Sequence, residues 1–231
     1  MKIKISALDL LFFGDSKPFV TGEDRRSQSL SVPNLSTLCG ALRTAYFAGH
    51  RDQFKYANEP EDPTAHLVIT DFHLMINFEA YYPVPADLVH IKDSPEDDSG
   101  NYQLYPLKSV SREGLISSSE KIGLEEIFVP AFEDQERADK VENLSNAYFS
   151  ETELRNYLEG FEGPYSAIRL DEMIGDESKF GIKRLDNSHA VEEGYLYQLS
   201  QKRYGDVSFI LEFEGLELPD KGLIKVGGQT G

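Results

Sequence analysis

Residues 1–50 carry apolar side chains at two different spacings. Polar residues 2, 4 and 6 alternate with apolar residues 3, 5 and 7, which is the two-residue period of a half-buried strand, and we expect this strand to run on through the apolar residues to Phe13 and to break at Gly14. Over residues 35–46 the apolar residues recur three or four positions apart, which predicts an amphipathic helix that begins at Asn34 or Ser36. A polar loop with several cations joins the two predicted elements.

The predicted helix has a second face that is not simply apolar. Ser36, Gly40, Arg43 and Phe47 are spaced three or four residues apart and therefore share this face. A glycine inside a helix costs about 1 kcal/mol relative to alanine, so Gly40 predicts that another backbone comes close there. The free N–H groups of the first turn, around Ser36 and Thr37, suit a phosphate group. The alternative is a surface helix that packs on a neighbour through a small residue.

The rest of the chain alternates strand patterns with polar segments. Residues 102–149 show no clean period, so we expect an irregular insertion there. Ser150 stands three residues before Glu153, a capping-box spacing that predicts a short helix ending near Gly160. Strands are predicted at residues 67–78, 180–183, 194–199, 207–214 and 223–226.

Composition narrows the class of protein. A hydrophobic content of 40% over 231 residues permits a core, so global disorder is not expected. No run approaches 18 apolar residues, which excludes an ordinary transmembrane helix, and no signal peptide is recognisable. Cys39 is the single cysteine, so no internal disulfide can form. These features predict a cytoplasmic protein with no membrane partner.

The net charge of −17 argues against nucleic acid, but the charge is unevenly distributed. Residues 1–60 hold 8 basic and 6 acidic side chains, residues 61–178 hold 8 and 26, and residues 179–231 hold 7 and 8. The acidity therefore belongs to the middle of the chain. A soluble acidic protein is the simplest interpretation, and a basic groove on an acidic body is the alternative.

The sequence contains no recognisable catalytic or metal-binding motif. The five histidines lack metal-ligand spacing, and there is no phosphate-binding loop, dinucleotide fingerprint or nucleophile elbow, so no metal and no cofactor are expected. Metal-free RNA cleavage would need a general base near a basic helix, and His50 is the one candidate.

Cations and aromatic residues are concentrated near the two chain ends, a combination that suits single-stranded RNA. The aromatic residues are Phe13, Phe19, Tyr195 and Tyr197. The cations are Lys17, Arg25, Arg26, Arg43, Lys183, Arg184, Lys202 and Arg203.

Several sequence blocks, in order along the chain, carry a family resemblance. They are LDLLFFGDSKPF (8–19), PNLSTLCGALR (33–43), YPVPADLV (82–89), YLEG (157–160), GIKR (181–184), AVEEGYLY (190–197) and VGG (226–228). Together they resemble the third subunit of the Cmr-type (type III-B) CRISPR effector complex, a member of the RAMP superfamily of RNA-binding proteins. Two features depart from the family. Gly14 stands where arginine is frequent, and the chain ends soon after the paired glycines, so we expect the C-terminal part of the family's chain to be absent.

The resemblance implies an α+β fold. It implies two ferredoxin-like domains, related to RNA recognition motifs, with insertions and with the second domain incomplete at its C-terminus. The corresponding division is an N-terminal core at 1–90 completed by later strands, an irregular acidic insertion at 91–149, and a partial second domain at 150–231.

The same resemblance implies a non-catalytic RNA-binding subunit of an antiviral effector complex. Such a subunit caps the 5′ handle of the guide RNA and docks the large polymerase-like signalling subunit and a backbone RAMP subunit. The residues expected to bind RNA are Lys17, Arg25, Arg26, Ser36, Thr37, Arg43, Lys183, Arg184, Gly227 and Gly228.

Two other functions stay open. One is a metal-independent endoribonuclease of the same superfamily that processes guide RNA, with His50 as general base. The other is an acidic protein–protein scaffold that makes no RNA contact, for which the acidic residues 92–142 would serve as the docking surface.

Overall fold

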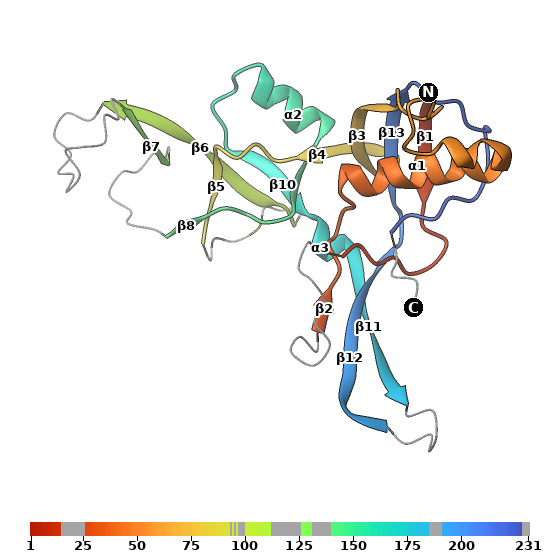
Figure 1. Cartoon of the computed structure of the whole chain (residues 1–231). Helices are drawn as coiled ribbons and strands as arrows, with labels where there is room; N and C mark the ends of the chain where they lie inside the picture. Colours follow the sequence, from red (N-terminus) through yellow and green to blue (C-terminus); the bar gives the residue numbers. More distant parts are fainter. Residues whose placement is uncertain are drawn as a thin grey trace, which may run out of the picture. The chain divides into compact units, whose positions relative to one another are not determined.

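The computed structural model describes residues 1–14, 26–92, 94, 96, 100–111, 126–130, 140–184 and 191–227. The chain forms two compact units, Met1–Phe78 with Asp171–Gly231, and Glu79–Leu170 (Figure 1). This division differs from the one expected at residues 90 and 149. Residues 79–170 form one unit, and strand β13 (Val207–Glu214) returns to pair with strands near the N-terminus, so both chain ends belong to the first unit.

The first unit is built on an antiparallel sheet in the order β1 (Lys2–Ser6), β13 and β3 (Val68–Ile76). The middle strand, β13, is buried on both faces over most of its length, and Phe209, Leu211 and Phe213 are its least exposed residues. Helix α1 (Leu35–Gly49) packs against β3 and buries Leu38, Ala41, Leu42 and Phe47. A 3-10 helix, η1 (Arg51–Tyr56), follows α1 directly (Figure 1).

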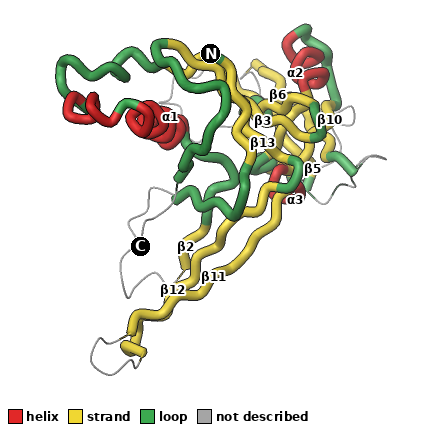
Figure 2. The backbone as a smooth tube through the Cα atoms, turned by 90° about the vertical axis from the view of Figure 1, so that its right-hand side faces the viewer, coloured by secondary structure: helices red, strands yellow, loops and turns green. Residues whose placement is uncertain are grey.

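A second, three-stranded sheet also belongs to the first unit. Strands β11 (Ile174–Arg184) and β12 (Val191–Tyr204) form a long antiparallel hairpin, and β2 (Arg26–Gln28) pairs in parallel with β12. Figure 2 shows these three strands side by side, with the hairpin extending well beyond β2. The start of β11 is joined to β10 (Tyr165–Arg169) through the short helix α3 (Leu170–Met173).

The second unit contains a sheet in the order β4 (Glu79–Pro83), β9 (Ala147–Ser150), β10 (Tyr165–Arg169), β6 (Tyr102–Ser111), β5 (Leu88–Ile91) and β8 (Val141–Glu142). Strand β7 (Glu126–Pro130) pairs with β6. Leu104, Phe149 and Ala167 lie in its apolar core, and helix α2 (Glu151–Leu158) packs beside β4, β9 and β10.

These elements confirm the predicted α+β class: the sheets are mostly antiparallel and the helices are few, as in a ferredoxin-like fold. Helix α1, helix α2 and strands β3 and β13 lie where the sequence predicts them. None of the helices in the described part of the chain is both long and apolar enough to cross a membrane.

Three local predictions were wrong. The first strand ends at Ser6, because residues beyond it leave the sheet and Leu11 pairs instead with the backbone of Lys202. Residues 223–226 form no strand. The segment 102–149, expected to be irregular, supplies β6 and β9 to the middle of the second sheet.

Candidate nucleic-acid interface

The loop between Gly14 and Ser29, called the basic loop for its Lys17, Arg25 and Arg26 although it carries an equal number of acidic side chains, is held at both of its ends. Gly14 bridges to Ser29, the N–H of Leu30 donates to the carbonyl of Phe13 (2.8 Å), and the N–H of Phe13 donates to Ser29 Oγ (2.8 Å). The loop therefore leaves and rejoins the fold at one fixed point. Lys17 and Arg25 lie outside the described residues, and Arg26 is described only as a backbone position in β2.

A polar cluster ties the exit of this loop to the base of the hairpin. Ser31 Oγ donates to Asp171 Oδ1 (2.5 Å), and the Tyr204 hydroxyl donates to the Ser31 carbonyl (2.8 Å). Lys202 Nζ donates to Asp176 Oδ2 at 3.0 Å and lies 3.9 Å from Asp171 Oδ1. The cluster fixes residues 29–31 just before helix α1 begins.

Gly227 packs against Phe12 and Phe13, the residues just before the basic loop. Its φ is +69°, and a Cβ atom there would stand 2.6 Å from the Phe12 carbonyl oxygen and 2.8 Å from Phe13 Cδ1. Glycine is required at this position because the C-terminal turn packs onto the segment that leads into the basic loop. The close neighbour of Gly227 is therefore this chain's own backbone, and RNA contact at this turn stays a prediction. Gly228 lies outside the described residues.

The N-terminus of helix α1 opens a few residues after the cluster. Asn34 is the N-cap residue, but its side chain makes no capping hydrogen bond, and the first turn contains no acidic side chain. Ser36 is exposed and Thr37 is half-buried. The N–H of Thr37 already donates to the Asn34 carbonyl (2.9 Å), so the N–H groups of Leu35 and Ser36 are the ones in the first turn suited to an anion.

Arg43 is used inside the fold. Its Nε donates to Thr64 Oγ1 (2.8 Å), and its Nη2 donates to Asn58 Oδ1 (2.9 Å) and to Asp62 Oδ2 (2.7 Å). The Asp62 side chain is only 6% exposed, whereas that of Arg43 is 34% exposed. The guanidinium therefore clamps residues 58–64 to α1, and only its remaining nitrogen, Nη1, is available to another group.

Asp62 is held as a carboxylate by four donors. The Thr64 hydroxyl contributes most to lowering the pKa of Asp62 to about 2, followed by the backbone N–H groups of Asn58 and Thr64, and the charge of Arg43 adds to them. Burial acts in the opposite direction but is the weaker effect. Since Asp62 is ionised at neutral pH, it neutralises much of the positive charge of Arg43.

The late cations divide between the base and the tip of the hairpin. At the base, Lys202 pairs with Asp176, and Arg203 donates to Glu177. At the tip, Lys183 and Arg184 are backbone positions of β11 whose side chains are not described. Ion pairing thus removes the base cations as free phosphate ligands and leaves the tip pair as the candidate.

The residue considered for cleavage chemistry takes part in local packing. The His50 ring stacks on Tyr46 with ring centroids 4.2 Å apart, and its Nδ1 lies 3.0 Å from the Tyr46 carbonyl oxygen. Across the part of the chain that the structure describes, no group of three or more metal-ligating side chains is placed to hold a metal ion.

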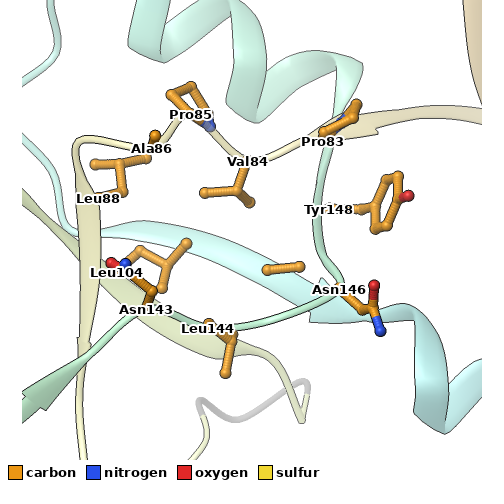
Figure 3. A pocket seen from close by; sticks show the side chains of 11 residues that line it. Pro83, Val84, Pro85, Ala86, Leu88, Leu104, Asn143, Leu144, Asn146 and Tyr148 are labelled. Atoms are coloured by element: carbon orange, nitrogen blue, oxygen red, sulfur yellow. The ribbon is translucent and has the colours of Figure 1, made fainter. Parts of the chain in front are cut away.

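The second unit has an apolar groove of about 320 Å³. One wall is the segment Pro83–Ala86, from which Val84 extends towards the middle of the labelled side chains (Figure 3). Leu104 and Leu144 lie opposite, and Asn143 and Asn146 supply polar groups. None of its lining residues is charged, so it is not suited to bind a phosphate.

Sequence reasoning missed two residues of the first unit that are well placed for a ligand, Arg51 and Phe54. Both line a groove of about 590 Å³ beside Gly40 and Arg43. The sequence feature that could have indicated Arg51 is the local charge: residues 35–58 contain three cations and a single acidic residue, Asp52, in a chain of net charge −17.

Comparison with known proteins gives one family and a common fold. A profile described as CRISPR-associated protein (Cas_Cmr3) matches residues 3–230. No curated protein matches the sequence significantly.

Among solved structures, the chain is similar to a chain of the cryo-EM structure of the Type III-B Cmr-beta bound to cognate target RNA, with 18% identity, a TM-score of 0.50, and coverage of 99% of this chain and 61% of that one. It is also similar to a chain of the Type III-B Cmr-beta bound to cognate target RNA and AMPPnP, state 1 (16% identity, TM-score 0.47, coverage of 99% and 60%). The protein thus spans about three-fifths of the length of those chains. Because the family profile extends over nearly the whole sequence, the protein belongs to the Cas_Cmr3 family of CRISPR-associated proteins.

Proposed function

We propose that the protein is a non-catalytic, RNA-holding subunit of a type III-B CRISPR effector complex, in which it caps the 5′ handle of the guide RNA. Family membership over residues 3–230 is the observation that carries this proposal. The partners would be the guide RNA, the large polymerase-like subunit and a backbone RAMP subunit, in the cytoplasm.

The arrangement of the first unit supports this function. The basic loop is anchored by Phe13 and Ser29, the Gly227 turn packs beside its start, and the uncapped N-terminus of α1 follows its exit. Free N–H groups of a helix and arginines on an anchored loop are the usual ligands of a phosphate backbone. We assign RNA contact to Lys17, Arg25, Arg26, Ser36, Thr37, Lys183, Arg184 and the glycine turn.

Arg43 has a reduced part in this proposal. Its hydrogen bonds to Thr64, Asn58 and Asp62 already occupy Nε and Nη2, so its contribution would come from the single nitrogen Nη1. Replacing Arg43 would loosen residues 58–64 as well as remove a cation, so it is a poor probe of RNA contact.

The test uses the complex reconstituted with guide RNA. Reversing charge with R25E and R26E should weaken binding of the intact handle and reduce the slope of log affinity against log salt by about 1 for each phosphate contact removed. R155E is the matched control, because Arg155 is an exposed arginine of α2 in the second unit. Unchanged handle affinity and salt slope in the double variant would contradict the assignment of the loop.

A further inference from the structure

A groove in the first unit lies between helix α1 and the segment that follows it. Gly40, Arg43 and Phe47 line it from α1, and Arg51, Phe54 and Asn58 line it from η1 and the turn after η1. Its volume of about 590 Å³ is within the range of small-molecule sites. Throughout, we call it the Gly40 groove.

No contact within the described part of the chain explains why a glycine occupies position 40 of helix α1. A glycine within a helix is destabilising relative to alanine, so it needs a compensating reason. The expected reason, a close backbone neighbour, is absent among the described residues, since an added Cβ would have nothing within 4 Å. The missing side chain instead leaves room in the groove, which points to a ligand over this turn of the helix.

The polar side of the groove is positively charged. Arg51 is exposed and pairs with no acidic side chain in the described part of the chain, and Arg43 retains its Nη1. The single acidic residue of the segment 35–58 is Asp52, which does not line the groove. In a chain of net charge −17, the exposed guanidinium of Arg51 favours an anionic ligand, and Arg43, whose charge Asp62 largely neutralises, adds the hydrogen-bond donor Nη1.

The apolar side of the groove presents aromatic surface. Phe54 is 65% exposed, although its ring packs edge-on against Phe47 with centroids 5.5 Å apart and an interplanar angle of 87°. An exposed ring held in place by a buried one is a platform on which a flat heterocycle can stack. An aliphatic ligand would fill the groove but would leave the guanidinium groups without partners.

We propose that the Gly40 groove binds one nucleotide. The base lies over Gly40 and against Phe54, and the phosphate is held by Arg51 and by Nη1 of Arg43. The nucleotide is either a free one or one unit of a bound RNA strand. In the second case the site is a subsite of the RNA-binding surface and rests on the function proposed above.

The test combines two variants with two matched controls in the full chain. G40L adds a bulky side chain at a groove position where a Cβ atom has nothing within 4 Å, and R51Q removes a cation from the groove. G49L places the same side chain at another glycine of α1 that has nothing within 4 Å, and K55Q removes a cation of η1 that does not line the groove. Thermal melting followed by circular dichroism checks that each variant folds. If G40L does not fold, G40A replaces it, because alanine adds a smaller side chain to the groove and has a higher helix propensity than glycine.

Binding of AMP and UMP by calorimetry and of a fluorescent 8-nucleotide RNA by polarisation separates the two sources. We expect G40L and R51Q each to lower affinity about fivefold or more, and G49L and K55Q to stay within about twofold. Loss for the mononucleotides identifies a free nucleotide, and loss for the RNA alone identifies a strand subsite.

Several results would overturn the proposal. A nucleotide site would be excluded if G40L and R51Q bound both ligands with the same affinity as the wild-type chain. It would also be excluded if the wild-type chain bound neither ligand. Wild-type RNA binding with loss of a partner subunit from the reconstituted complex would show that the groove holds protein. Binding of the guide-RNA handle by the complex, measured with R25E and R26E, tests the proposed function separately. The groove proposal and the proposed function can therefore be contradicted independently.

Discussion

Gly227 approaches Phe12 so closely that a Cβ atom on residue 227 would stand 2.6 Å from the Phe12 carbonyl oxygen. These two residues are distant in sequence, and their contact brings the end of the described chain onto the segment that leads into the basic loop. Val226 beside it is buried, so the turn is part of the core of the first unit. The glycine turn is therefore a structural element of the region assigned to RNA.

Gly227→Ala should destabilise the first unit by about 2–3 kcal/mol, because alanine is strained at a φ of +69° and its methyl group meets backbone. Urea denaturation followed by circular dichroism measures the change. Gly222→Ala is the control, since a Cβ there has nothing within 4 Å, and it should stay within about 0.5 kcal/mol of wild type. Equal effects of the two variants would contradict the packing role of Gly227.

Gly215→Ala should be more damaging, because a Cβ there would lie 1.9 Å from the His66 carbonyl oxygen at a φ of +76°. Gly215 directly follows β13, and His66 lies just before β3, so the clash would push the end of β13 away from the start of β3. The effect should be large because β13 lies between β1 and β3 in the sheet. We expect the variant to lose the native circular dichroism spectrum at 25 °C or to melt well below wild type. A melting temperature equal to that of wild type would show that the turn can move aside.

Lys202→Met tests the cluster at the base of the hairpin. Its side chain is 9% exposed, and methionine keeps the apolar stem but removes the ion pair with Asp176. We expect a loss of about 1–2 kcal/mol, since the aspartates left behind are partly exposed and can be hydrated. Denaturant titration gives the value.

The matched control is Arg203→Met on the neighbouring residue of β12. Arg203 also pairs with an acidic residue, Glu177, but its side chain is 57% exposed. Exposed ion pairs contribute little to stability, so this variant should unfold at nearly the wild-type denaturant midpoint. If both variants lost the same stability, burial of Lys202 would not be the cause.

Helix α2 shows how far local sequence signals reach. Ser150 Oγ accepts from the N–H of Glu153 (3.3 Å), and Gly160 follows the helix with a φ of +81°, both as predicted. The N–H of Phe161 donates to the Asn156 carbonyl (3.0 Å), which completes a Schellman motif. The second half of the capping box is missing, because Glu153 Oε2 accepts from the distant N–H of Ser166 instead.

Other elements could not be predicted from periodicity. Strand β9 buries Ala147, Tyr148 and Phe149 consecutively, so it has no two-residue alternation to recognise. Residues 223–226 have a strand-like composition, but no strand of the described chain pairs with them. In both segments, pairing with residues distant in the sequence determines whether a strand forms.

The candidate site was predictable in composition and less so in role. The sequence identified Arg43 as a cation on one face of α1 but could not show that Asp62, nineteen positions later, faces it. Gly40 was recognised as unusual, yet its open surroundings appear only in the folded chain. Residue type and local spacing therefore indicate the chemistry, whereas tertiary contacts determine which groups are free to bind.

Asp62→Asn should lower the melting temperature at neutral pH, because it removes the carboxylate that Arg43, Thr64 and the N–H of Asn58 hold. The pKa of Asp62 in the folded chain, about 2, lies below the ordinary value of 3.8, so its carboxylate stabilises the fold above pH 3.8 and loses that effect as the pH falls towards 2. The gap in melting temperature between wild type and variant should therefore be full at pH 5 to 7 and narrow below about pH 4. Thermal melts between pH 7 and pH 2.5, with the exposed neighbour variant Glu61→Gln as control, measure the gap, and a gap that stayed constant over this range would mean that Asp62 is not held as an ionised partner of Arg43.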